Sequence, residues 1–190
     1  MAEVDQAFAL RADGVALAGE RACLAVPGFE FGNSPAELAE RDVRFSRLVL
    51  TTTNGTRLLH AAAPAYEVVL VGSLLNLDAV AAAARGTGAD RLAVLCAGIE
   101  GEVALDDVYC AGRIAALLDG TPSDGAVAAM RVAAAFASPR AALDASRSAQ
   151  NLRDAGLDAD VEWCARESVL DVAPRVEGAT AGEPQRVIAC

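Results

Sequence analysis

Residues 48–57 read LVLTTTNGTR, and this stretch decides the expected fold class. An apolar run at 48–50 ends at three threonines and an Asn-Gly pair, and the apolar segment that follows at 58–63 has the composition of a helix. The stretch therefore predicts a strand, a loop and a helix. In an open α/β sheet such a loop lies at the carboxyl end of its strand, where ligands bind.

The residues of this loop suit an oxyanion. Gly55 permits a positive φ or a close approach of the backbone to a ligand, and the helix that follows supplies unpaired N–H groups. Hydroxyls come from Thr51, Thr52, Thr53 and Thr56. An ordinary turn in which Asn54 or Thr56 caps the helix explains the same residues. Neither a Walker-type Lys-Ser/Thr nor a dinucleotide-binding glycine pattern is present.

The same order of elements recurs twice. Residues 67–72 (EVVLVG) predict a strand that ends at Gly72-Ser73, with a helix at 74–85, and residues 91–96 (RLAVLC) predict a strand that ends at Ala97-Gly98, with a helix at 105–118. These runs are apolar at successive positions, as in a sheet covered on both faces. The sequence thus predicts a three-layer α/β/α fold with a mostly parallel or mixed sheet.

The remaining segments predict covering elements around that sheet. Residues 1–13 read as a helix fragment, and Ser34 with Pro35 and Glu37 forms a strong helix start. Helices are expected at 121–137 and 138–154, short strands or extended segments at 160–164 and 169–176, and a mobile tail at 178–190. No long linker divides the chain, so residues 1–190 are expected to form a single domain.

Charge and composition narrow the class of ligand. The net charge is −10 with no local Lys/Arg cluster, which argues against a nucleic-acid partner, and no apolar run reaches the length of a membrane span. The five cysteines show no C-x-x-C spacing, so we expect reduced thiols in the cytoplasm. The single histidine, His60, excludes a multi-histidine zinc site. A small ligand is the expectation.

Acidic residues gather after the third expected strand. Two glycines space Glu100 and Glu102, and Asp106 and Asp107 stand at a helix start. A hard cation held by a few carboxylates, water and substrate would account for them, and so would simple stabilisation of the helix dipole. Cys96 is not expected to be the nucleophile of a cysteine phosphatase, because that chemistry needs an arginine where Glu102 stands. Packing as a small apolar residue accounts better for Cys96.

Several ordered motifs together resemble the 2-phosphosulfolactate phosphatases, the ComB-like family. The resemblance is colinear over roughly residues 15–175 and is carried by LAGER at 17–21, GFEFGNSP at 28–35, TTTNGTR at 51–57, GSLLN at 72–76, CAG at 96–98, and LDD through CAG at 105–112. It implies an α/β enzyme of the coenzyme M biosynthesis type, dependent on Mg²⁺. The implied reaction hydrolyses 2-phospho-3-sulfolactate to sulfolactate and phosphate.

The resemblance also implies a set of site residues. Catalytic roles fall to Glu102, Asp106 and Asp107, with Mg²⁺ on Asp106 and Asp107, whereas the nucleophile stays unnamed. The substrate is a small anion carrying phosphate, sulfonate and carboxylate, for which Arg21 and Arg57 are suited. The implied substrate-binding residues are Glu20, Arg21, Asn33, Ser34, Thr53, Asn54, Gly55, Thr56, Arg57, Ser73, Asn76, Cys96 and Gly98.

One departure from the family supports a second hypothesis. The family opens with a strand, a helix and another strand, including an Asp-Val-Leu-Arg-Ala-Thr-Ser-like stretch, and nothing in residues 1–14 matches that stretch. A degenerate, non-catalytic homologue that binds an anionic metabolite or serves assembly is therefore the alternative. A sheet without those strands would expose apolar edges, so we expect either a natural start upstream or pairing in a homo-oligomer.

Overall fold

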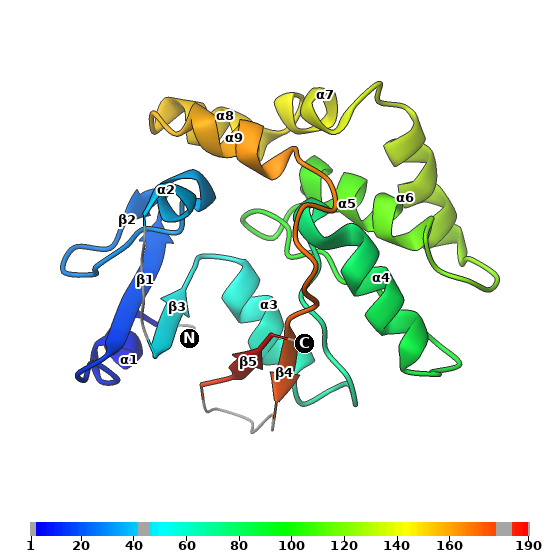
Figure 1. The fold of residues 1–190 in the computed structure, drawn as a ribbon. Coiled ribbons are helices and arrows are strands. Elements are labelled where there is room, and N and C mark those ends of the chain that lie inside the picture. The colour runs from blue at the N-terminus through cyan, green and yellow to red at the C-terminus, as the bar shows by residue number, and fades with distance from the viewer. Residues whose placement is uncertain (1–2, 42–45, 178–183, 190) are drawn as a thin grey trace.

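A small mixed sheet lies at one end of the molecule (Figure 1). The computed structural model describes residues 3–41, 46–177 and 184–189. Its first sheet has the order β2-β1-β3, in which β1 (Val15–Arg21) pairs parallel with β3 (Arg47–Thr51) and antiparallel with β2 (Leu24–Ala25). The chain is therefore α/β, and the strand predicted at the start of 48–57 is confirmed as β3.

The ends of β1 and β3 approach each other closely at Gly19. A Cβ at this position would lie 2.1 Å from the carbonyl oxygen of Thr51, and Gly19 has φ +156°. Only glycine fits so close to a neighbouring backbone. The contact brings Glu20 and Arg21, which end β1, beside the loop that follows β3.

Helices make up most of the rest of the described chain (Figure 1). Helix α3 (Gly55–Ala62) follows β3, as predicted, and a 3₁₀ turn η1 (Leu74–Asn76) precedes α4. The other helices are α1 (Val4–Phe8), α2 (Pro35–Glu40), α4 (Leu77–Gly86), α5 (Leu105–Ala115), α6 (Asp124–Ala134), α7 (Pro139–Asp144), α8 (Arg147–Asp154) and α9 (Asp158–Cys164). None of the helices described is long and apolar enough to cross a membrane.

Most predicted helices are confirmed, but two predicted segments differ from the structure. The helix expected over 138–154 is two helices, because the Ser146 hydroxyl accepts a hydrogen bond from the Ala149 N–H and caps a new start at α8. The expected strand or extended segment at 160–164 is wrong, because these residues belong to α9. A short apolar run fits either period, and the acids in the first turn of α9, Asp158 and Asp160, favour a helix.

The strands expected at 67–72 and 91–96 differ most from the structure. Neither segment forms a ladder strand, and residues 91–96 carry no regular secondary structure. Leu70 makes an isolated bridge to Arg175 in β4 (Arg175–Glu177), which itself pairs with β5 (Arg186–Ile188). The sheet is therefore smaller than predicted, since a strand needs a hydrogen-bonded neighbour that the apolar pattern alone does not provide. Of the expected mobile tail, residues 178–183 and 190 lie outside the described part, whereas 186–188 form β5.

The buried side chains fall into two clusters. One gathers Ala7, Leu17 and Val49 from α1, β1 and β3. The other gathers side chains from η1 and the helices α4 to α9, with Leu74, Tyr109 and Val161 among its members. Helix α9 of the second cluster also contacts α2 of the sheet side, so α2 and α9 connect the two parts (Figure 1).

A buried carboxylate makes this connection. Asp160 is only 3% exposed, and its Oδ1 accepts hydrogen bonds from the Ser34 hydroxyl at 2.6 Å and from the Ala36 N–H at 3.1 Å. Ser34 also accepts from the Glu37 N–H, as its predicted capping role requires. The start of α2 is thus held by an acid that lies 126 residues away from Ser34 in the sequence.

Replacing this acid tests its role. Asp160→Ala should lower the free energy of unfolding by about 1–3 kcal/mol, because the hydroxyl and the N–H would remain buried without an acceptor. Urea denaturation measures the change. The control Asp171→Ala removes an exposed carboxylate and should cost less than about 0.5 kcal/mol. Equal effects of the two substitutions would contradict the assignment.

Candidate active site

Glu20 holds the loop after β3 in place through hydrogen bonds. This side chain is 9% exposed, and its Oε1 accepts hydrogen bonds from the Thr53 N–H at 2.8 Å and the Thr53 hydroxyl at 2.9 Å. Its Oε2 accepts from the Cys23 N–H at 3.1 Å in the β1–β2 turn. Glu20 was expected to bind substrate, and in the structure its carboxylate accepts both hydrogen bonds that position Thr53.

The loop also closes on itself through two threonines. The Thr56 hydroxyl donates to the Thr52 carbonyl at 2.9 Å and accepts from the Thr52 N–H at 3.2 Å, and the Thr52 hydroxyl accepts from the Thr56 N–H at 3.3 Å. Asn54 occupies the N-cap position of α3 without a side-chain cap hydrogen bond. These bonds fix the loop in shape, while Gly55 and Arg57 remain exposed at its surface.

Arg21 lies beside the same loop. Its Nη2 donates to the Thr51 hydroxyl at 3.0 Å and its Nη1 donates to the Glu20 carbonyl at 2.6 Å. Arg21 is half-buried, and Thr51 is fully buried. The guanidinium therefore connects the ends of β1 and β3. This contact places a positive charge beside the start of the loop.

Asp107 closes the second loop, at 96–102. Its Oδ2 accepts a hydrogen bond from the Gly98 N–H at 2.7 Å. Gly98 has φ +69°, and a Cβ there would lie 2.5 Å from the Glu102 carbonyl oxygen, so glycine is required. Next to it, Glu100 and Gly101 form a tight turn between Ile99 and Glu102, which hydrogen-bond to each other.

Asp106 is held by a residue that the sequence did not single out as part of the site. The Ser148 hydroxyl, in α8, donates to its Oδ1 at 3.0 Å. Burial raises the pKa of the Asp106 carboxyl and the nearby charge of Asp107 adds to this, whereas the Ser148 hydrogen bond opposes it. Arg147 pairs with Glu100. Ser148 lies 42 residues from its partner, so no local pattern in the sequence connects the two residues.

The thiols near these acids are poor nucleophiles. Although Cys96 as a residue is exposed, burial of its thiol raises its pKa, and the charges of Asp107 and Asp106 raise it further. Burial, followed by the charge of Asp107, raises the pKa of Cys110 to about 12. Both thiols are therefore protonated near neutral pH, which agrees with the sequence argument against a cysteine nucleophile.

The acids offer a limited site for a cation. Among the residues that the structure describes, no group of three or more His, Cys, Asp or Glu side chains could hold a metal ion. Glu102, which is exposed, therefore does not join Asp106 and Asp107 in a three-carboxylate site. Asp106 and Asp107 are half-buried neighbours in the first turn of α5, with the Asp106 Oδ1 accepting from the Ser148 hydroxyl and the Asp107 Oδ2 from the Gly98 N–H. Such a pair fits Mg²⁺, which commonly takes one or two protein carboxylates and completes its shell with water and substrate oxygens.

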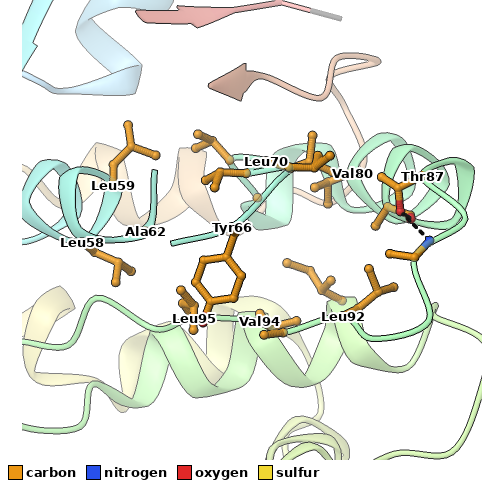
Figure 2. Close-up of a pocket in the computed structure, with 18 of the residues that line it drawn as sticks. Leu58, Leu59, Ala62, Tyr66, Leu70, Val80, Thr87, Leu92, Val94 and Leu95 are labelled. Atoms are coloured by element: carbon orange, nitrogen blue, oxygen red, sulfur yellow. Dashed lines mark hydrogen bonds between the residues drawn. The ribbon is translucent and has the colours of Figure 1, made fainter. Parts of the chain in front are cut away.

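The two loops reach one cavity of about 670 Å³. Gly55, Gly72, Ala97 and Asp107 all line it, so the exits of three predicted strands converge there. This convergence was the expectation for an open α/β sheet. The rest of the lining is mainly leucine, valine and alanine (Figure 2).

Other expected binding residues have hydrogen-bond partners within the chain. The Asn76 side chain is 4% exposed, and it donates to the carbonyls of Val71 and Val172 and accepts from Ser73. Ser73 and Asn76 cap each other at the start of η1. Ser34 is occupied by Asp160, as described above. Asn33 is exposed on the loop before α2.

Comparison with known proteins identifies the family. The model of the 2-phosphosulpholactate phosphatase family matches residues 1–179. The chain belongs to this family. The match extends the resemblance from residues 15–175 to the first residue. A probable 2-phosphosulfolactate phosphatase of Thermus thermophilus is 40% identical over 179 residues, covering 92% of this chain and 76% of the relative.

Two further relatives agree with this assignment. The 2-phosphosulfolactate phosphatase of Methanothermobacter thermautotrophicus is 38% identical and covers 92% of this chain and 74% of the relative. A probable 2-phosphosulfolactate phosphatase of Deinococcus radiodurans is 42% identical over 84% of this chain and 68% of the relative. The relatives are thus longer than the part that this chain matches.

The role of Glu20 can be tested in this family member. Glu20→Ala should speed hydrogen exchange of the Thr53 amide and lower the free energy of unfolding by about 1–3 kcal/mol, because three donors lose their acceptor. Exchange mass spectrometry and urea denaturation report the two effects. Glu40→Ala, at the exposed end of α2, is the matched control and should leave both unchanged. Unchanged exchange at Thr53 in Glu20→Ala would refute the positioning role.

Proposed function

We propose that this chain hydrolyses 2-phospho-3-sulfolactate to sulfolactate and phosphate. The observation that carries the proposal is the family match over residues 1–179, together with relatives of that name at about 40% identity. The geometry supports it, because the two loops fixed by Glu20 and Asp107 open onto one cavity. Phosphate monoester hydrolysis needs positioning and charge stabilisation more than covalent chemistry from the protein.

Asp106 and Asp107 are our proposed Mg²⁺ ligands. A substrate with three acidic groups would be repelled by two half-buried aspartates in a chain of net charge −10 unless a cation lay between them. Bound Mg²⁺ would neutralise charge on the phosphoryl oxygens and lower the pKa of a bound water. The Gly98 N–H and the Ser148 hydroxyl would orient the two carboxylates.

Arg57 is our proposed contact for an acidic group of the substrate. It is exposed in the first turn of α3, next to Gly55 at the cavity, and no ion pair joins it to any other described residue. A guanidinium can hold a carboxylate, sulfonate or phosphate through two parallel hydrogen bonds. Glu20 and Arg21 act indirectly in this scheme, since they position the loop that carries Arg57.

We also propose the finer points of architecture and location. In a complete sheet, residues 67–72 and 91–96 would be strands covered by helices on both faces, which gives the three-layer α/β/α arrangement. The free thiols of Cys23, Cys96, Cys110 and Cys164 and a phosphorylated metabolite as substrate support a cytoplasmic enzyme.

Phosphate release from 2-phosphosulfolactate tests the reaction directly. We expect turnover in Mg²⁺ and loss of turnover in excess EDTA, restored by adding Mg²⁺. Without the cation, the negative charges of the aspartates would repel the phosphoryl group that is transferred. A colorimetric phosphate assay measures it. Equal turnover in EDTA would refute the metal role, and binding without turnover would favour the non-catalytic alternative.

Asp107→Asn separates charge from shape. The amide oxygen can still accept the Gly98 N–H, so the loop should persist, while the loss of charge should lower kcat by about 100-fold. The matched control is Asp119→Asn, an exposed acid in the turn after α5, which should retain full activity. Turnover of Asp107→Asn at the level of Asp119→Asn would contradict the proposal.

Arg57→Ala tests the substrate contact. Removing a charge-assisted hydrogen bond should raise KM about 10-fold or more. Steady-state kinetics measures KM. Urea denaturation should show little change in the free energy of unfolding, because Arg57 is exposed. Arg131→Ala, an exposed arginine near the end of α6, should leave KM unchanged, and equal KM values for the two variants would count against Arg57.

A further inference from the structure

Arg147 begins helix α8 beside the two aspartates of the candidate active site. The next residue, Ser148, donates a hydrogen bond to the Asp106 Oδ1 at 3.0 Å, and the Arg147 guanidinium itself pairs with Glu100. Glu100 belongs to the loop that Asp107 closes. The first turn of α8 therefore contacts both Asp106 and the loop held by Asp107, which places the charge of Arg147 near this pair of acids.

The ion pair between Arg147 and Glu100 is easily exchanged. Both side chains are largely in water, because Arg147 is 57% exposed and Glu100 is 68% exposed. An ion pair so exposed adds little net stability, since water solvates both charges when the pair opens. A strongly charged ligand can therefore displace Glu100 from the guanidinium with little loss.

The two other arginines of helices α7 and α8 have more ion-pair partners than Arg147. Arg140 pairs with three acids and Arg153 with two, which are drawn from Asp144, Asp158 and Glu162. Glu100 is the one ion-pair partner of Arg147 among the described residues. Arg147 is therefore the arginine of these two helices whose charge is most available to a ligand.

Glu100 holds this guanidinium from an unusual backbone position. It has φ +53° and is followed by Gly101 with φ +83°, in a two-residue turn closed by hydrogen bonds between Ile99 and Glu102. Such a turn favours glycine, asparagine or aspartate at the position of Glu100. Glutamate is strained there, and its carboxylate is the group that contacts Arg147. A backbone outlier of this kind points to a function for the side chain.

The substrate of the proposed reaction needs a cationic contact at each end. In 2-phospho-3-sulfolactate the phosphate is on the middle carbon, and the carboxylate and the sulfonate are on the carbons at either side. With the phosphoryl group at Asp106 and Asp107, both end groups need hydrogen-bond donors of their own. Arg57 of α3 is the proposed donor for one end. A second arginine on another element would hold the other end.

We propose that Arg147 binds the carboxylate of this substrate, which replaces Glu100 on the guanidinium. The partner of Arg147 in the structure is itself a carboxylate, so its surroundings already suit that group. The inference rests on the proposed function for the identity of the substrate. On this assignment Arg57 holds the sulfonate, and Glu100 disfavours ligands that have no carboxylate to replace it.

Calorimetric binding of sulfolactate, a product of the proposed reaction, tests this contact in Mg²⁺. Arg147→Ala should weaken binding about 10-fold or more, because a charge-assisted hydrogen bond to the carboxylate is lost. Glu100→Gln should have the opposite effect and strengthen binding about 2-fold or more, because the competing charge is gone. In the Arg147→Ala background, Glu100→Gln should make little difference.

The opposite signs distinguish a binding role from a structural one. If the ion pair only fixed the loop, loss of either partner would weaken binding to a similar extent. Arg186→Ala and Glu177→Gln are the matched controls, since these residues form another exposed ion pair in the β4–β5 hairpin, away from α8 (Figure 1). Both controls should leave binding unchanged. All four substituted side chains are exposed, so urea denaturation should show that each variant folds.

An analogue of sulfolactate decides which acidic group Arg147 holds. In 2-hydroxypropane-1-sulfonate a methyl group replaces the carboxylate, so Arg147→Ala should bind this analogue as well as the unaltered chain does. A loss of affinity for the analogue equal to the loss for sulfolactate would show that Arg147 does not hold the carboxylate, and it would overturn the assignment.

Two further outcomes would overturn the proposal: normal binding of sulfolactate by Arg147→Ala, and weakening by Glu100→Gln that equals the weakening by Arg147→Ala. Phosphate release from 2-phosphosulfolactate, measured with the same samples, keeps the two proposals apart. The expected binding pattern without turnover refutes the proposed reaction alone. Turnover whose KM is the same in Arg147→Ala and in the unaltered chain refutes the role of Arg147 alone.

Discussion

The buried carboxylate of Asp160 connects two hydrophobic clusters that otherwise share few contacts. One cluster surrounds β1 and β3, and the other lies among the helices that follow η1. Asp160 receives the Ser34 hydroxyl and the Ala36 N–H, so it caps α2 from α9. A buried carboxylate of this kind is stable only while its hydrogen-bond donors are present. The position of α9 therefore depends on that of α2, and the position of α2 on that of α9.

The candidate active site spans the same two clusters. Glu20 and Arg21 fix the loop of residues 51–57 on the sheet side, while Asp107 fixes the loop at Gly98 on the helical side. Each loop is shaped by an acid or base that hydrogen-bonds to backbone or hydroxyl groups. The side chains that we propose for ligand binding are consequently few, chiefly Arg57, Asp106 and Asp107. Holding these groups on rigid supports is what phosphoryl transfer requires of a protein.

The apolar cavity lies between the two supports. Residues of the segments 66–72 and 91–97 line it, and among the described residues no backbone hydrogen bond involves 91–97. In a parallel sheet each strand depends on its neighbours for hydrogen bonds, so the apolar pattern of 91–96 does not by itself make these residues a strand.

The sequence by itself determined the features that depend on a few neighbouring residues. These include the strand, loop and helix around Asn54-Gly55, the start of α2 at Ser34-Pro35 and the family resemblance carried by ordered motifs. Local backbone preferences and caps act within a turn or two, so a pattern shows them. Tertiary structure decided that 160–164 is a helix, that 91–96 has no ladder, that Asp160 is the partner of Ser34 and that Glu20 positions Thr53. In each case the outcome depends on a hydrogen-bond partner or a buried surface far away in the sequence, which no local pattern encodes.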